Sequence, residues 1–340
     1  MRPDRNLDIL RSMAVFTVLV AHLRPASPLQ EAIGHYGVLI FFVHTSLVLL
    51  LSLERQMDRP RFALRFYIQR VFRIYPLSIL CVLVTLAFRI SWPDPVFHSP
   101  SGLSIAANLL LVQNFLHDRF SVSPPLWSLP FEVQMYAVLP FVFWLLRERR
   151  MRVAITLLAI ALALPVCESQ IAPLGGLWIT RYFPCFLSGG LAYCGYKSGR
   201  CLRWWLWPVF IAGLGAVYSI MGAHAPADWL ICIVLGSFLP LFREAPGSRL
   251  SQASGLVAQY SYGIYLAHAP LIWLCFQRLT LASMTAGYLL FTALLCVVPV
   301  VLYHFVEKPA ITAGKALSLR ILPEPDTTGS ALCIGESTAA

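Results

Sequence analysis

The chain has 340 residues, of which 58% are hydrophobic and 12% charged, and its formal net charge is +10. Soluble domains carry about 25% charged residues, so this composition excludes a single water-soluble domain and predicts an all-α integral membrane protein in a lipid bilayer. The basic residues lie in short clusters between apolar runs, which indicates membrane topology and gives no sign of a nucleic-acid partner. The nine cysteines show no CxxC spacing, so we expect neither a disulfide framework nor a metal site.

Hydrophobic runs give the predicted architecture. A membrane helix needs about 20 mostly apolar residues, and ten stretches satisfy this: residues 7–24, 36–53, 71–90, 128–146, 153–169, 177–196, 203–222, 227–242, 259–277 and 284–305. A shorter apolar patch at 103–117 predicts an interfacial or re-entrant helix. With both termini in the cytoplasm, most lysines and arginines fall on the cytoplasmic side, as the positive-inside rule requires.

Residues 1–309 are therefore expected to form one transmembrane domain. Residues 310–340 lose apolar character and gain Pro, Glu, Ser and Thr, which predicts a disordered cytoplasmic tail. The segment "YHFVEKPA" before this tail has the composition of a helix end, so we expect the last helix to stop there.

The first predicted span contains two ionisable residues on one face. Arg11 and His22 are eleven residues apart, which at 100° per residue is within about 20° of three full turns. They are separated by roughly 16 Å along the helix axis. Ionisable side chains within a span are costly and usually functional, although Arg11 could instead be a snorkelling anchor and His22 a helix-end residue at the headgroups.

Further charged residues lie at the ends of other spans. Arg70 and Arg73 share a helix face and either mark the cytoplasmic side or bind phosphates through their planar guanidinium groups. Glu132 opens the fourth predicted span, where it either complements the helix dipole or pairs with a histidine and orients it. His44, Ser46 and His268 lie mid-span, where polar side chains also serve as interhelical hydrogen-bonding groups.

Six short motifs occur along the chain in the same order as in a known protein family. The chain resembles the membrane acyltransferase family 3, whose members O-acylate O-antigens, exopolysaccharides and nodulation factors. The matching motifs are the Arg-x10-His of Arg11 and His22 within "LDILRSMAVFTVLVAH", then "GVLIFFVHTS", the Arg-x-x-Arg of Arg70 and Arg73, "WSLPFEVQMY", "SYGIYLAHAPLI" and "VEKP". Two departures stand out: "FFVHTSLVL" replaces the usual "FFVLSGFLI", and only Glu132 remains of two adjacent acidic residues.

The resemblance implies a multi-pass enzyme of the bacterial inner membrane that transfers an acyl group from acyl-CoA to a hydroxyl of a glycan or glycolipid. The acyl group is commonly acetyl, with acetyl-CoA as donor and no metal. It implies catalytic roles for His22 and Arg11, and we add Glu132 as the partner of His22 and Arg70 with Arg73 as the donor-phosphate site. We expect the substrate pocket to include His44, Ser46, Trp127, Tyr136 and His268.

Two alternatives stay open. The acyl group could pass through a covalent intermediate on His22, Ser46 or a cysteine. A transporter or flippase for a glycan or lipid-linked substrate would also have many helices and intramembrane charges, although related halves, which are frequent in transporters, are not evident in this sequence.

Overall fold

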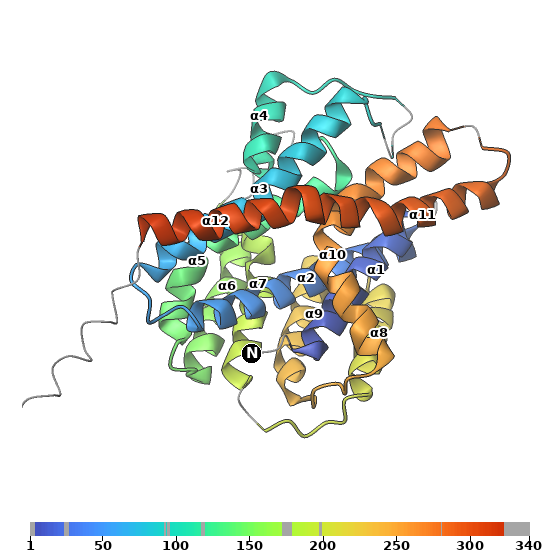
Figure 1. Cartoon of the computed structure of the whole chain (residues 1–340). Helices are drawn as coiled ribbons and strands as arrows, with labels where there is room; N and C mark the ends of the chain where they lie inside the picture. The colour runs from blue at the N-terminus through green and yellow to red at the C-terminus, as the bar shows by residue number, and fades with distance from the viewer. Residues whose placement is uncertain are drawn as a thin grey trace, which may run out of the picture.

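The computed structural model describes residues 4–23, 27–91, 93, 96–116, 120–171, 179–196, 199–279 and 281–322. Within these ranges the named elements are all helical (Figure 1). The α-helices are α1 (Arg5–His22), α2 (Pro28–Glu54), α3 (Phe62–Ala87), α4 (Gly102–Leu110), α5 (Leu129–Leu146), α6 (Met151–Ile171), α7 (Ile179–Gly195), α8 (Leu206–Met221), α9 (Ala225–Phe238), α10 (Arg249–Ile272), α11 (Met284–Leu302) and α12 (Lys308–Ile321). The short helices are η1 (Gln113–Phe115), η2 (Pro124–Trp127), η3 (Leu239–Leu241) and the π-helices η4 (Trp273–Arg278) and η5 (Tyr303–Glu307).

The all-helical class is confirmed, and each predicted span overlaps one of these α-helices. In the part of the chain that the structure describes, four helical stretches are long and apolar enough to cross a membrane: Pro28–Glu54, Phe62–Ala87, Pro124–Leu146 and Met284–Ile321. Shorter apolar helices occur at Met151–Cys167, Leu206–Met221 and Ala225–Leu241. The number of ten spans and the cytoplasmic termini stay predictions.

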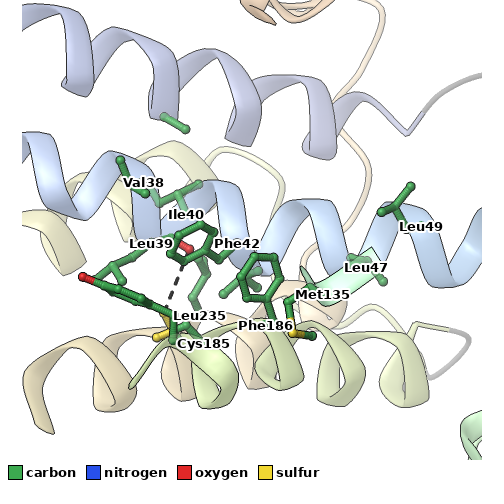
Figure 2. Close-up of a cluster of buried hydrophobic side chains, with 14 of the residues drawn as sticks. Val38, Leu39, Ile40, Phe42, Leu47, Leu49, Met135, Cys185, Phe186 and Leu235 are labelled. Atoms are coloured by element: carbon green, nitrogen blue, oxygen red, sulfur yellow. Dashed lines mark hydrogen bonds between the residues drawn. The ribbon is translucent and has the colours of Figure 1, made fainter. Parts of the chain in front are cut away.

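Helix α2 forms the centre of the bundle. In its most apolar window 72% of the residues are buried, against 11% for Met284–Ile321, so the latter lies on the periphery. Phe42 of α2 stacks on Phe186 of α7, with ring centroids 4.4 Å apart, and Figure 2 shows both among other buried apolar side chains. A helix that is apolar on all sides is suited to such a central position.

Two glycines of α2 bring α1 close. A Cβ atom at Gly34 would lie 2.9 Å from the Cβ of Ala21, and one at Gly37 would lie 2.7 Å from the carbonyl oxygen of Ala14. Small residues allow such close backbone approach between membrane helices. As a result the α1 residues that follow Ala14, up to His22, lie directly against the first half of α2.

The last helix differs from our expectation. It does not stop at "VEKP" but continues through π-helix η5 into α12, and Figure 1 shows α11 and α12 as one long red rod. Pro309 lacks an N–H and its ring would clash with a preceding carbonyl in an ideal helix, which accounts for the widened turn at η5. The prediction that the chain is disordered from residue 310 is therefore wrong up to Ile321, where α12 ends. Residues 323–340 lie outside the described residues.

Helix α12 is held by α3. A Cβ at Gly314 would lie 2.6 Å from the Cβ of Phe72, and buried Arg65 donates a hydrogen bond to the carbonyl of Leu322. The packing of α12 on α3 fixes the position of η5 next to the predicted phosphate-binding residues of α3.

The patch predicted at 103–117 is helical at α4 and η1. Its amide side chains form hydrogen bonds with the backbone of the loop that leads to α5. Asn108 donates to the carbonyl of Phe120 and accepts from the backbone N–H of Val122, and Gln113 donates to the carbonyl of Leu126. These bonds hold the loop before α5 and thus position Trp127 and Glu132.

Candidate active site

A small charged cavity lies between α1, α2, α3, α5 and α10. Its volume is about 100 Å³, and we call it the arginine cavity. Its polar lining comprises Arg11, His44, Thr45, Arg70, Arg73, Ser128, Glu132, Tyr136, Ser261, Tyr262 and Tyr265. The three arginines predicted from the sequence therefore meet in one place, although Arg11 is on a different helix from the other two.

Two carboxylates partly neutralise these arginines. Glu307 of η5 forms an ion pair with Arg73, and its side chain is completely buried. Glu132 accepts a hydrogen bond of 2.8 Å from the hydroxyl of Tyr136, one turn further along α5. Three guanidinium groups against two carboxylates leave one positive charge uncompensated among the side chains described there.

The remaining donors favour an anionic ligand. The Nε atoms of Arg11 and Arg70 are buried and have no hydrogen-bond partner among the described residues. A buried cation without a partner is costly, and guanidinium groups bind the paired oxygens of phosphates and carboxylates especially well. The arginine cavity can thus hold a group of about the size of a phosphate.

A larger cavity adjoins the first and contains three histidines. Its volume is about 710 Å³, within the range of about 300–1,000 Å³ that is typical of ligand pockets. We call it the histidine cavity; its polar lining comprises His22, Gln30, Glu31, His35, Trp127, Tyr265, His268 and Tyr288. The rings of His22 and His268 are 5.0 Å apart between centroids, so α1 and α10 present two imidazoles to the same space.

The tautomers of these two imidazoles follow from their backbone contacts. Nδ1 of His22 lies 2.7 Å from the carbonyl oxygen of Val18, and Nδ1 of His268 lies 2.6 Å from that of Tyr265. Because a carbonyl oxygen only accepts, each Nδ1 carries the hydrogen and each neutral ring keeps its lone pair on Nε2. A fixed Nε2 lone pair is what a general base requires.

Val38 and Tyr265 line both cavities and form their common wall. The hydroxyl of Tyr265 is 2.8 Å from that of Ser128, which fixes the tyrosine in this wall. Arg11 and His22, which the sequence predicts on one face of the first span, therefore line two adjoining cavities.

The predicted site residues are divided between the two cavities. His44 and Tyr136 line the arginine cavity, and Trp127 and His268 line the histidine cavity. Glu132 was expected beside His22 but lies with the arginines, so it is not the partner of that imidazole. Ser46 lines neither cavity, because it packs on α7, where a Cβ at Gly189 would lie 2.6 Å from its own Cβ.

Sequence reasoning missed Glu307 and His35. Glu307 was assigned to a helix end, and only its neighbouring Pro309 hinted at a local irregularity. His35 lies two residues before the quoted motif "GVLIFFVHTS", and an isolated histidine near a helix end carries no signal of its own.

Comparisons with known proteins give the family of the chain. The chain matches the family model for the acyltransferase domain of acyltransferase family 3 over residues 4–304. A relative in Bacillus subtilis (strain 168), "Putative peptidoglycan O-acetyltransferase YrhL", is 24% identical; the match covers 93% of this chain and 56% of that protein, so the chain spans little more than half of its length.

A second relative, "Putative acetyltransferase ORF330" of Acidianus two-tailed virus, is 25% identical over 78% of this chain and 82% of its own length. No solved structure matches the chain significantly. Because the family model covers nearly the whole chain, the protein belongs to acyltransferase family 3 and carries its acyltransferase domain.

Proposed function

We propose that this chain is a membrane-bound O-acyltransferase that moves an acyl group, in the first place acetyl, from acetyl-CoA to a hydroxyl of a cell-envelope or exported glycan. Family membership supports acyl transfer, and the names of the two relatives support acetyl as the group transferred. The observation that carries the proposal is the adjacency of a cavity with two paired imidazoles to a cavity with three arginines.

In this proposal His22 is the general base. Its Nε2 takes the proton of the acceptor hydroxyl while the oxygen attacks the thioester carbonyl carbon. As the carbon–sulfur bond breaks, the imidazolium returns the proton to the leaving thiolate, so the protein ends unchanged. General base catalysis of this kind contributes about 10²- to 10⁴-fold to the rate. Val18 keeps the ring in the required tautomer through its carbonyl.

The arginines bind the donor. Arg70 and Arg11 have buried Nε donors without a partner, while Arg73 is held by Glu307. A phosphate oxygen of the donor would complete these contacts and balance the remaining positive charge. At about 100 Å³ the arginine cavity accommodates a phosphate group but not a nucleotide, so the rest of the donor extends outside it.

Glu132 takes a different role from the one we expected. It accepts a hydrogen bond from Tyr136 and lines the same cavity as the arginines, so its negative charge limits the net positive charge of that cavity. In this proposal the pantetheine arm runs from the arginine cavity past Val38 and Tyr265 into the histidine cavity. There its thioester meets the acceptor and His22. This route makes both cavities parts of one site.

The test is acetyl transfer by the purified protein in nanodiscs. With radiolabelled acetyl-CoA and soluble N-acetylglucosamine oligomers, the wild type should form O-acetylated sugar, and His22→Ala should lower kcat at least 100-fold. A control variant, His304→Ala, replaces an exposed histidine of η5 and should keep full activity. Normal transfer by His22→Ala would refute the base assignment.

The same assay separates the proposal from its rival. A transporter or flippase in the bacterial plasma membrane could use both cavities without breaking a bond, and it would leave acetyl-CoA intact in every condition. Labelled acetyl that stays on the protein after denaturation would instead indicate a covalent intermediate.

A further inference from the structure

We propose that His35, held by Asp228, binds the acceptor sugar in the histidine cavity through a hydroxyl group. This inference rests on the proposed function for the identity of the acceptor, but its geometry stands independently. His35 is the third imidazole of this cavity, and neither the base role of His22 nor the donor site uses it.

The position of His35 follows from the packing of α2. Glu31, Gly34, His35 and Val38 all line the histidine cavity and have the spacing i, i+3, i+4, i+7 of one helix stripe. Gly34 lets α1 approach this stripe, since a Cβ at that position would lie 2.9 Å from Ala21 and 4.0 Å from Cε1 of His22. The base and His35 thus enter one cavity from two tightly packed helices.

The carboxylate of Asp228 faces the Nε2 side of the His35 ring. Nε2 of His35 lies 3.4 Å from Oδ2 of Asp228, a long contact, and has no other partner among the described residues. A carboxylate only accepts, so this approach favours the tautomer with its hydrogen on Nε2 and its lone pair on Nδ1. With Nε2 turned to Asp228, Nδ1 is the ring nitrogen that remains for a ligand.

The charge of Asp228 is balanced without His35. Arg181 donates to Oδ2 of Asp228 through two nitrogens, at 2.8 and 3.3 Å, and the hydroxyl of Tyr218 donates to Oδ1 at 2.6 Å. Asp228 lies in the first turn of α9, where the helix dipole favours a negative charge. Since the carboxylate already has a cation and a hydroxyl donor, Asp228 does not depend on His35, and Nδ1 of His35 is left to accept a hydrogen bond from a sugar hydroxyl.

Aromatic rings fix the plane of the imidazole. The ring of His35 is nearly parallel to those of Trp127 and Tyr218, with interplanar angles of 12° and centroid distances of 5.8 and 6.3 Å. Trp127 also lines the cavity. A ring held by stacking and by Asp228 is preorganised, which lowers the entropic cost of binding. The amide of Gln30 and the carboxylate of Glu31 add polar groups for further hydroxyls on the same side.

The test compares two substitutions that are equal in charge and close in size. The amide of asparagine reaches the place of Nδ1, whereas the amide of glutamine reaches the place of Nε2. We therefore expect His35→Asn to keep the affinity for chitotetraose, a soluble N-acetylglucosamine oligomer, within about twofold. His35→Gln and His35→Ala should weaken it about five- to tenfold, as expected for one lost neutral hydrogen bond.

Binding is measured by isothermal titration of the full chain in nanodiscs, and the KM for the same sugar is measured in the acetyl-transfer assay. His35→Gln and His35→Ala should raise the KM, His35→Asn should keep it within about twofold, and all three should leave kcat within about twofold, because His35 does not take part in proton transfer. His304→Ala is the control for loss of an imidazole outside the cavity, and thermal unfolding checks that each variant is folded. A merely structural His35 would lower the unfolding temperature and leave the KM unchanged.

Each outcome decides between the two proposals. If the wild type transfers acetyl and His35→Ala binds chitotetraose equally well, the sugar site is wrong and the proposed function stands. If the wild type binds the sugar in a His35-dependent way but transfers no acetyl, the site stands and the function is wrong. Equal losses in His35→Asn and His35→Gln, or no binding by the wild type, would overturn the assignment.

Discussion

Removal of the Glu307 carboxylate should destabilise the protein, because it leaves Arg73 without its partner. The side chain of Glu307 is completely buried and that of Arg73 is 22% exposed. Breaking a buried ion pair lowers the free energy of unfolding by about 3–5 kcal/mol. Because Arg73 is partly exposed, we expect Glu307→Gln to lower it by about 3 kcal/mol. The substitution also raises the net charge of the ionisable side chains at the arginine cavity from one to two positive charges. The assay is thermal and denaturant unfolding of the purified protein in mild detergent.

The chain offers a matched control on its surface. Glu148 and Arg150 also form an ion pair, but their side chains are 54% and 68% exposed. Glu148→Gln should therefore cost only about 0–1 kcal/mol. A double-mutant cycle with Arg73→Met should show coupling with Glu307→Gln of at least 1 kcal/mol. Equal effects of the two glutamate substitutions, or additive effects in the cycle, would refute the account of Glu307.

Three other predictions test the packing and the route of the donor. Gly37→Ala places a methyl group against Thr17 and should destabilise the protein by about 1–3 kcal/mol in the same unfolding assay, whereas Gly199→Ala, which meets no atom within 4 Å, should not. Val38→Phe should block the passage between the two cavities and lower acetyl transfer at least tenfold without weakening the binding of free CoA. Unchanged transfer would place the path of the donor elsewhere. Arg70→Lys keeps the charge but loses the planar fork, so the Kd for acetyl-CoA should rise about tenfold, and an unchanged Kd would remove Arg70 from the donor site.

Hydrophobic runs and helical periodicity were sufficient to predict most of the long helices, although not α12, and part of the site. The eleven-residue spacing of Arg11 and His22 places both on one side of α1, and each does line a cavity there. Likewise, the three-residue spacing of Arg70 and Arg73 brings both into the arginine cavity. These predictions succeed because they depend only on positions within one helix.

The predictions that failed depend on contacts between distant segments. Glu307 meets Arg73 across 234 residues, and the π-helix that aims it is a local response to Pro309. Glu132 is oriented towards the arginines by the rotation of α5 in the bundle, which a single helix pattern does not determine. Ser46 faces α7 because Gly189 allows close packing there, and the pairing of His35 with Asp228 joins α2 to α9.

The most direct test of the central claim is a structure of the protein bound to a non-hydrolysable acetyl-CoA analogue, determined by electron cryo-microscopy in nanodiscs. The account predicts a phosphate of the analogue on Arg11 and Arg70 and its acetyl carbonyl in the histidine cavity, within about 4 Å of the place where a hydroxyl bound to Nε2 of His22 would lie. An analogue bound outside both cavities, or an acetyl group on the far side of the Val38 and Tyr265 wall from His22, would contradict it.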